Sequence, residues 1–240
     1  MNGYADLHCH ILPGTDDGPG TLEEARDMLH IARAEGITDI VATPHFAPSI
    51  PGFDGAGGME AFPVVAAMAQ SMGITLHPGT EIFLDEYAHA ALKAGRCLPL
   101  GDSRHVLLEL PDRADLAQHH GWMTAFLSDG WIPILAHVER LEALQADPQA
   151  LEEWTDAGCL LQVNASTLLG GWTDIRRRTA KTLIKHGMCH LIATDAHSPG
   201  SRAPLVQAAC RKVGTWVGEA EALRLLRDTP RRILGLPAWT

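Results

Sequence analysis

The sequence predicts a single α/β domain over residues 1–240, folded as a distorted (β/α)7 barrel of the TIM type. Three observations support this prediction. Seven short apolar segments alternate with amphipathic ones, no Gly/Ser linker divides the chain, and six of the seven apolar segments run into a His, Asp or Glu. Alternating strands and helices are typical of parallel sheets built from βαβ units. The ionisable strand ends then decide between a barrel and an open sheet.

The expected elements follow one another in strict alternation. The first helix begins with a capping-box pattern at Thr21 and ends at Gly36, which suits a left-handed C-terminal residue. The Pro/Gly-rich stretch 47–58 has no periodicity and is expected to form a long loop over a site. The strands are expected at 5–9, 39–43, 74–77, 106–110, 132–136, 160–164 and 189–194, and the helices at 21–35, 59–72, 86–94, 115–128, 151–157, 174–186 and 202–217.

Composition excludes several classes of protein. The net charge of −10 argues against a nucleic-acid partner, which would require a basic face. The five cysteines are scattered without a C-x-x-C pair, which favours a reducing compartment over a disulfide framework. No apolar stretch is long enough for membrane insertion, and the N-terminus lacks an export-signal pattern. We therefore expect a cytoplasmic protein.

Two histidines at the end of the first strand are the first candidate metal ligands. Side chains alternate between the faces of a strand, so His8 and His10 point to one face and Cys9 to the other. Two imidazoles on one face can hold a divalent ion together. An isolated H-x-H is equally compatible with unrelated histidines, so the pair needs support from the other strands.

The remaining strand ends supply that support. In a (β/α) barrel the carboxyl ends of all strands converge on one face, whereas an open sheet would spread them along a row. Shared ligands therefore favour the barrel. The ionisable residues that follow the later strands are His45, Glu81, Glu109, His137, Asp195 and His197, and the loop after the first strand adds Asp17.

The chemistry of these residues indicates a centre with several ions. Nitrogen and oxygen ligands without thiolate suit Mn, Fe or Zn in a catalytic site. The ligands outnumber what one ion can use, so two or three ions are expected. Such clusters commonly activate water for attack on phosphorus. The sequence therefore predicts a metal-dependent phosphoesterase.

Seven motifs resemble one known superfamily along nearly the whole chain. The sequence is similar to the PHP (polymerase and histidinol phosphatase) superfamily, and more specifically to its branch of bacterial manganese-dependent protein-tyrosine phosphatases linked to capsule and exopolysaccharide synthesis. The two motifs most specific to this branch are HILPGTDDGP and TDAHSPGSR. The full set is HCHILPGTDDGP, ATPHF, GTEIF, LLELP, AHVER, LQVNASTLLG and ATDAHSPGSR.

The resemblance implies a seven-stranded barrel with three divalent ions, manganese by preference. It assigns His8, His10, Glu81 and Asp195 to a first ion. Through the bridging Glu81 it adds Glu109 and His137 for a second ion, and Asp17, His45 and His197 for a third. It also implies that Arg140 and Arg202 hold the phosphate, although Val138 stands where the family commonly has proline.

The expected reaction is in-line attack on phosphorus by a hydroxide that bridges the metal ions. A phenolate leaving group, with a pKa of about 10, needs less assistance from a general acid than an alkoxide does. No general acid is assigned, and no C-x5-R loop of the cysteine phosphatases is present. Phe46, next to the ligand His45, is expected to stack on the aromatic leaving group.

Other functions remain open at this point. Histidinol phosphatase and other small-molecule phosphatases share the metals and differ in the loops that admit the substrate, such as 47–58. A non-catalytic regulatory domain of the same fold is disfavoured because all nine ligand positions are filled. The resemblance implies a phosphotyrosine protein as partner, specifically the tail of a bacterial tyrosine kinase. The sequence also leaves a homo-oligomer open.

Overall fold

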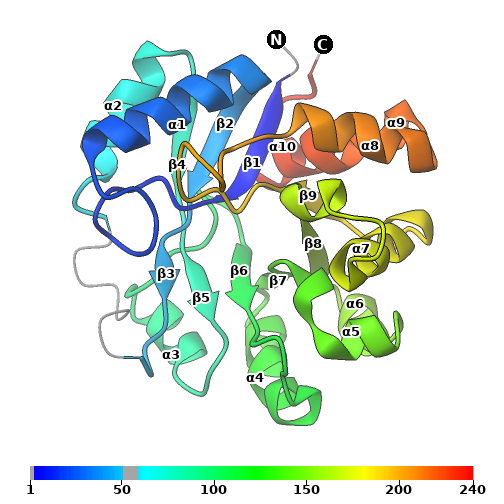
Figure 1. The fold of residues 1–240 in the computed structure, drawn as a ribbon. Coiled ribbons are helices and arrows are strands. Elements are labelled where there is room, and N and C mark those ends of the chain that lie inside the picture. Colours follow the sequence, from blue (N-terminus) through cyan, green and yellow to red (C-terminus); the bar gives the residue numbers. More distant parts are fainter. Residues whose placement is uncertain (1–2, 51–58, 240) are drawn as a thin grey trace.

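The computed structural model describes residues 3–50 and 59–239, and its centre is a curled parallel sheet (Figure 1). Strands pair in parallel in two hydrogen-bonded groups, ordered β1-β2-β4 and β3-β5-β6-β7-β8-β9. The strands are β1 (Tyr4–Cys9), β2 (Ile37–Ala42), β3 (His45–Phe46), β4 (Thr75–Pro78), β5 (Glu81–Phe83), β6 (His105–Glu109), β7 (Ile132–Leu135), β8 (Leu160–Asn164) and β9 (Leu191–Ala193).

These nine strands occupy seven strand positions, as the sequence predicts. The chain runs from β2 into β3 after two residues and from β4 into β5 after two residues, so each pair continues one strand. The last strand position meets the first through a bridge between Cys9 and Ala196, where the His10 amide donates to the Ala196 carbonyl at 2.8 Å. The sheet is therefore joined from its last strand back to its first.

Residues at the two strand breaks explain why the ladder is interrupted there. Pro44 lies between β2 and β3 and has no amide hydrogen to donate to a neighbouring strand. At Gly79, between β4 and β5, a β-carbon would lie 2.6 Å from Cγ1 of Val41, so only glycine fits beside β2. The Glu81 amide donates to the Pro44 carbonyl at 3.1 Å, which keeps the broken strands joined.

The first helix has the ends that its sequence predicts. The Thr21 hydroxyl accepts from the Glu24 amide at 3.2 Å, and Gly36 ends the helix with a φ of 85°. Helices lie around the outside of the strands (Figure 1). The longer ones are α1 (Leu22–Glu35), α2 (Phe62–Ser71), α4 (Leu116–Ser128), α7 (Ile175–Lys185) and α8 (Gln207–Val217), and the shorter ones are α3 (Ala88–Lys93), α5 (Glu142–Ala146), α6 (Glu152–Asp156), α9 (Glu219–Leu223) and α10 (Thr229–Ile233).

One predicted helix starts later in the structure than the sequence pattern indicates. The expected helix 202–217 begins only at Gln207, because Pro204 lies within an irregular segment after β9. The expected helix 151–157 is confirmed by α6, and the sequence pattern missed the short helix α5 before it. The sequence pattern also missed the chain after α8, where α9, a π-helical turn η3 (Arg224–Asp228) and α10 follow one another. The predicted loop 47–58 falls mostly outside the described residues.

The core has an inner and an outer part. The inner cluster fills the barrel with residues of several strands and is joined by Ile233 of α10; it consists of Leu7, Val41, Leu100, Leu107, Ile134, Ala136, Leu191 and Ile233. A larger cluster packs the strands against the helices, and Cys9 and Phe46 belong to it. Apolar side chains thus occupy the barrel below the strand ends. No helix in the described part of the chain is long and apolar enough to cross a membrane.

Candidate metal centre

The nine predicted ligands come together at the carboxyl ends of the strands. His8 and His10 lie at the end of β1, and a one-residue register shift against β2, between Asp6 and Cys9, accompanies them. Their Nε2 atoms are 3.1 Å apart. Parallel pairing places His45 of β3 in register with Glu81 of β5. Four overlapping sets hold ligand atoms within 4.8 Å of one another: His8, His10 and Asp195; His8, Glu81 and His137; His45, Glu81 and Glu109; and His10, Asp17, His45 and His197.

Glu81 is the centre of this arrangement. Its Oε2 lies 3.2 Å from His8 Nε2, 3.1 Å from His10 Nε2 and 3.0 Å from His45 Nδ1. The side chain is fully buried, yet this oxygen has no hydrogen-bond partner among the described residues. A buried carboxylate oxygen that faces several imidazole nitrogens outside hydrogen-bond geometry is well placed to share metal ions with them. The donor set therefore fits divalent cations.

Electrostatics point to the same conclusion. Burial and the neighbouring Glu81 carboxylate raise the pKa of Glu109 to about 7. Burial alone would also raise the pKa of Asp195, but the nearby His8 lowers it, to about 2. Carboxylates that are crowded together and desolvated require positive charge nearby. Divalent ions in this cluster would supply that charge.

Asp16 orients two of the candidate ligands from the loop after β1. Its Oδ2 lies 2.7 Å from His10 Nδ1 and accepts from the His45 amide at 3.0 Å. Burial would raise the pKa of Asp16, but the hydrogen bond and charge of His10 lower it to about 2. The His10 Nδ1 is thereby occupied, which leaves Nε2 for a metal ion.

The strand without a predicted ligand, β8, contributes two amide side chains. Gln162 Oε1 lies 3.1 Å from His8 Nδ1 and accepts from the His137 amide at 3.0 Å. Gln162 Nε2 donates to Asn164 Oδ1 at 2.8 Å, and Asn164 Nδ2 donates to Asp195 Oδ2 at 2.7 Å. The sequence reasoning missed this chain of hydrogen bonds because it searched for charged strand ends. The sequence signal was the spacing of the two amides, since residues two apart on a strand point to the same face.

Glu139 is a second residue that the sequence reasoning missed. It is fully buried in the 3-10 turn η1 (Val138–Arg140), and burial raises its pKa to about 7. Its Oε1 accepts from the Thr167 hydroxyl at 2.8 Å and from the backbone amide of Asn164 at 3.2 Å. Glu139 thus connects the turn that carries Arg140 to the loop after β8.

Both predicted arginines lie beside the candidate ligands. Arg140 Nη2 donates to Asp195 Oδ2 at 2.7 Å. Arg202 Nη1 donates to Asp17 Oδ2 at 2.9 Å, and its Nη2 lies 3.4 Å from Asp195 Oδ1. Both side chains are partly exposed, so they can reach an incoming anion. Val138, in the same turn as Arg140, is buried.

Phe46, which is expected to stack on the leaving group, borders the hollow beside His45 and Glu109 but is mostly packed in the core. Because side chains alternate along β3, His45 faces the ligand cluster and Phe46 faces the helices. The Phe46 residue is only 1% exposed, and the Arg96 guanidinium lies 5.6 Å from its ring centroid. A ring that is packed in the core has almost no free face for a substrate. Phe83 of β5, two residues after Glu81, is a more exposed aromatic residue on the ligand-bearing face.

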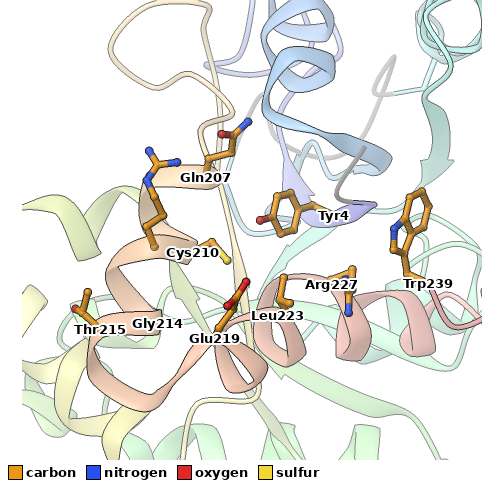
Figure 2. Close-up of a pocket in the computed structure, with 10 residues that line it drawn as sticks. Tyr4, Gln207, Cys210, Gly214, Thr215, Glu219, Leu223, Arg227 and Trp239 are labelled. Carbon is orange, nitrogen blue, oxygen red and sulfur yellow. The ribbon is translucent and has the colours of Figure 1, made fainter.

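Another hollow, of about 610 Å³, lies away from these residues (Figure 2). Figure 2 shows Gln207, Cys210, Gly214 and Thr215 of α8 on one side of it, with Tyr4 of β1 and Trp239 near the C-terminus on the other. None of the nine candidate ligands lines it. The candidate site is therefore the ligand cluster at the strand ends.

The fold and the site define the class of protein: a (β/α) barrel of the metal-dependent hydrolase type. The chain belongs to the capsular polysaccharide synthesis CpsB/CapC family, whose model matches residues 4–235. It is 28% identical to the tyrosine-protein phosphatase CpsB of Streptococcus pneumoniae over 236 residues, covering 95% of this chain and 97% of that protein. It is 30% identical to the tyrosine-protein phosphatase YwqE of Bacillus subtilis over 200 residues, covering 82% and 78%.

The structural comparison agrees with the family assignment. A crystal structure from work on YwqE and CpsB, described as unique metal-dependent tyrosine phosphatases, superposes with a TM-score of 0.87. The match has 25% sequence identity and covers 98% of this chain and 96% of that one. The predicted superfamily and fold are thereby confirmed.

Proposed function

We propose that the protein is a metal-dependent protein-tyrosine phosphatase of the CpsB/CapC family. The observation that carries the proposal is the clustering of nine His, Asp and Glu side chains, among them the buried Glu81, at the barrel end. The names of the relatives support the substrate class, because CpsB and YwqE are tyrosine-protein phosphatases. Histidinol phosphatase, the small-molecule alternative, is kept as an alternative outcome of the test.

The proposed ions number three, with manganese favoured over iron and zinc. The cluster of His8, His10 and Asp195 would hold one ion with Glu81. Glu81 would also bind a second ion together with Glu109 and His137. His137 Nε2 lies 3.1 Å from Glu81 Oε1 and 3.5 Å from Glu109 Oε1, and Glu109 Oε2 lies 3.7 Å from His45 Nδ1. The remaining three, Asp17, His45 and His197, would hold the third.

The residues of the chain then have separable roles in phosphate-ester hydrolysis. Bound divalent ions supply positive charge and lower the pKa of water, which makes a nucleophile available near neutral pH. Arg140 and Arg202 bind the phosphate oxygens, because a guanidinium fork matches their geometry. Asp195 and Asp17 hold the two arginines in place before substrate arrives. The tyrosine phenolate leaves without a dedicated general acid, since its pKa is about 10.

The proposed partner is a phosphotyrosine protein, specifically the tail of a bacterial tyrosine kinase. The family's place in capsular polysaccharide synthesis supports a role in exopolysaccharide regulation. We further propose that the enzyme acts in the cytoplasm, where such a kinase tail would be phosphorylated.

The test measures phosphate release from a metal-stripped protein after addition of Mn²⁺. The substrates are a phosphotyrosine peptide, a phosphoserine peptide and histidinol phosphate. We expect release from the phosphotyrosine peptide, and its loss in a His8→Ala/His10→Ala variant. A His30→Ala variant, which changes an exposed histidine of α1, is the matched control and should retain activity. Preference for histidinol phosphate would replace the substrate class, and no release with any divalent ion would overturn the proposed function.

A further inference from the structure

We propose that an apolar groove beside the metal centre binds the aromatic ring of the substrate, and that Phe83 and Ile50 make the enzyme selective for aryl phosphates. The inference rests on the proposed function and specifies its substrate-binding subsite. The groove has a volume of about 380 Å³, enough for a phenyl ring. Three candidate ligands and four apolar residues line it: Asp17, His45, Glu109, Phe46, Ala47, Ile50 and Phe83.

The groove lies where a substrate has access to the cluster. Among the nine candidate ligands, the most exposed side chains are Asp17, His45 and Glu109, at 56%, 23% and 24%. The other six are buried. All three accessible ligands line the groove. A phosphate that reaches the cluster therefore passes next to the apolar wall, and the group esterified to it remains there.

Phe83 is placed in this wall by strand register. It is two residues after Glu81 on β5, so both side chains are on the same face of the strand. Parallel pairing with β6 puts Phe83 in register with Glu109. Its ring is only partly buried, unlike that of Phe46. Phe83 thus presents an aromatic surface directly beside a candidate metal ligand.

Ile50 forms the outer edge of the same wall. Its amide donates to the Ala47 carbonyl at 2.9 Å, a turn that folds the chain back after β3. The residue is 43% exposed although its side chain is large and apolar. A bound ring would cover part of this surface, and removing apolar area from water stabilises the complex.

The arginines fix the direction in which a phosphate ester lies. Arg202 contacts Asp17 at 2.9 Å, and Arg140 contacts Asp195, so both cations reach the cluster. Phosphate oxygens held there leave the ester oxygen free to point along the groove. An aryl ester would then place its ring against Phe83 and Ile50. A phosphoserine side chain is shorter by a whole ring and would leave this wall uncovered.

The experiment compares two small substrates in the metal-loaded protein. Phenyl phosphate carries a ring, and trifluoroethyl phosphate carries an activated alkyl group. The variants are Phe83→Ala and Ile50→Ser, with Leu22→Ser as the matched control, since Leu22 is equally exposed at the start of α1 and outside the groove. Each variant is compared with the wild type on the same two substrates, so the difference in leaving-group acidity cancels.

We expect Phe83→Ala to lower kcat/KM for phenyl phosphate by about 10-fold or more, which is typical of removing a wall from an apolar pocket. The value for trifluoroethyl phosphate should stay within about 2-fold. Ile50→Ser should also lower kcat/KM for phenyl phosphate, but by a smaller factor. Because Ile50 is exposed, this substitution should not impair folding. Leu22→Ser should change neither substrate.

A binding measurement separates the groove from the chemistry. Phenylphosphonate and methylphosphonate lack a leaving group, and calorimetry gives the affinity of each for the metal-loaded protein. Phe83→Ala should weaken phenylphosphonate only. Equal losses for both phosphonates and both substrates would overturn the groove while leaving the phosphatase intact. Absence of turnover in the wild type would instead overturn the proposed function, with the phosphonate comparison still deciding the groove.

Discussion

Uncharged side chains hold the charged ones in place at this site. Gln162 contacts a ring nitrogen of His8 and the backbone of His137 through one oxygen atom. Because that oxygen can only accept, His8 Nδ1 must carry its proton, and Nε2 is left to bind a metal ion. Asn164 continues the chain of hydrogen bonds to Asp195. An amide pair thus sets the orientation of two candidate ligands.

Changing Gln162 tests this orientation. Gln162→Leu removes the acceptor, so we expect Mn²⁺ affinity to fall by about 10- to 100-fold, as for other residues that orient metal ligands. Gln162→Glu keeps an acceptor for His8 and should retain most of the affinity. Calorimetric titration of the metal-free protein measures both, with Gln70→Leu on the exposed side of α2 as control. Equal affinity in wild type and Gln162→Leu would contradict the role.

Among the secondary-structure elements, the broken strands do most to shape the site. At the junction between β4 and β5, the backbone of Gly79 passes so close to β2 that a β-carbon would meet Val41 at 2.6 Å and Leu100 at 3.1 Å. Two residues later the chain presents Glu81 to the cluster. The close approach therefore places the central ligand.

Two glycine substitutions should change stability in opposite directions. Gly79→Ala inserts a methyl group into packed atoms and is expected to lower the free energy of unfolding by about 1–3 kcal/mol. Gly121 lies inside α4, is exposed, and would have no atom within 4 Å of a new β-carbon. Gly121→Ala should therefore raise the free energy of unfolding by about 0.5–1 kcal/mol. Urea unfolding measures the free energy of unfolding of both variants. An unchanged value for Gly79→Ala would show that β2 and Leu100 can move aside.

For the whole molecule, the two ends of the barrel have opposite requirements. The carboxyl ends of the strands gather charge for chemistry, while the amino ends hold the barrel together with neutral or paired groups. Asp39 of β2 accepts from Arg231 of α10 at 3.0 Å and lies 3.2 Å from His77 of β4. Burial would raise the pKa of Asp39, but these contacts lower it overall. Figure 1 shows both chain termini beside β1 and α10.

His190, just before β9, should make stability depend on pH. Its Nδ1 accepts from the Leu161 amide at 3.0 Å, which requires an unprotonated nitrogen. Burial and the charge of Arg224 lower the pKa of His190 in the folded protein. The unfolded chain, with a histidine pKa of about 6.5, then binds more protons, so this stability is present above about pH 6.5 and is lost as pH falls below it.

Urea unfolding of the metal-free protein at about pH 8 and about pH 5.5 tests this effect. His190→Asn offers the Leu161 amide an acceptor that does not titrate. The loss of stability on acidification should be smaller in this variant than in the wild type. An identical loss in both proteins would assign the pH dependence to other groups, such as the histidines of the metal centre.

The sequence by itself determined the seven strand positions and the nine candidate ligands. Both depend on local patterns, because alternation within a strand sets which face His8 and His10 share, and each ligand stands at a strand end. Parallel strands of a barrel end together on one face, so strand ends that carry ligand-type residues favour a barrel. The role of amide side chains such as Gln162 could not be predicted, because nothing in a single strand distinguishes a ligand-orienting amide from a packed one.

Only the tertiary structure decided which neighbours the ligands have. Phe46 and Phe83 are both aromatic, close to a candidate ligand in sequence and next to the groove, yet Phe46 is only 1% exposed and Phe83 is only partly buried. Register between β5 and β6 pairs Phe83 with Glu109, and that pairing joins residues 26 positions apart. Contacts across strands depend on register and closure, which are non-local, whereas the face of a side chain depends on its own strand alone.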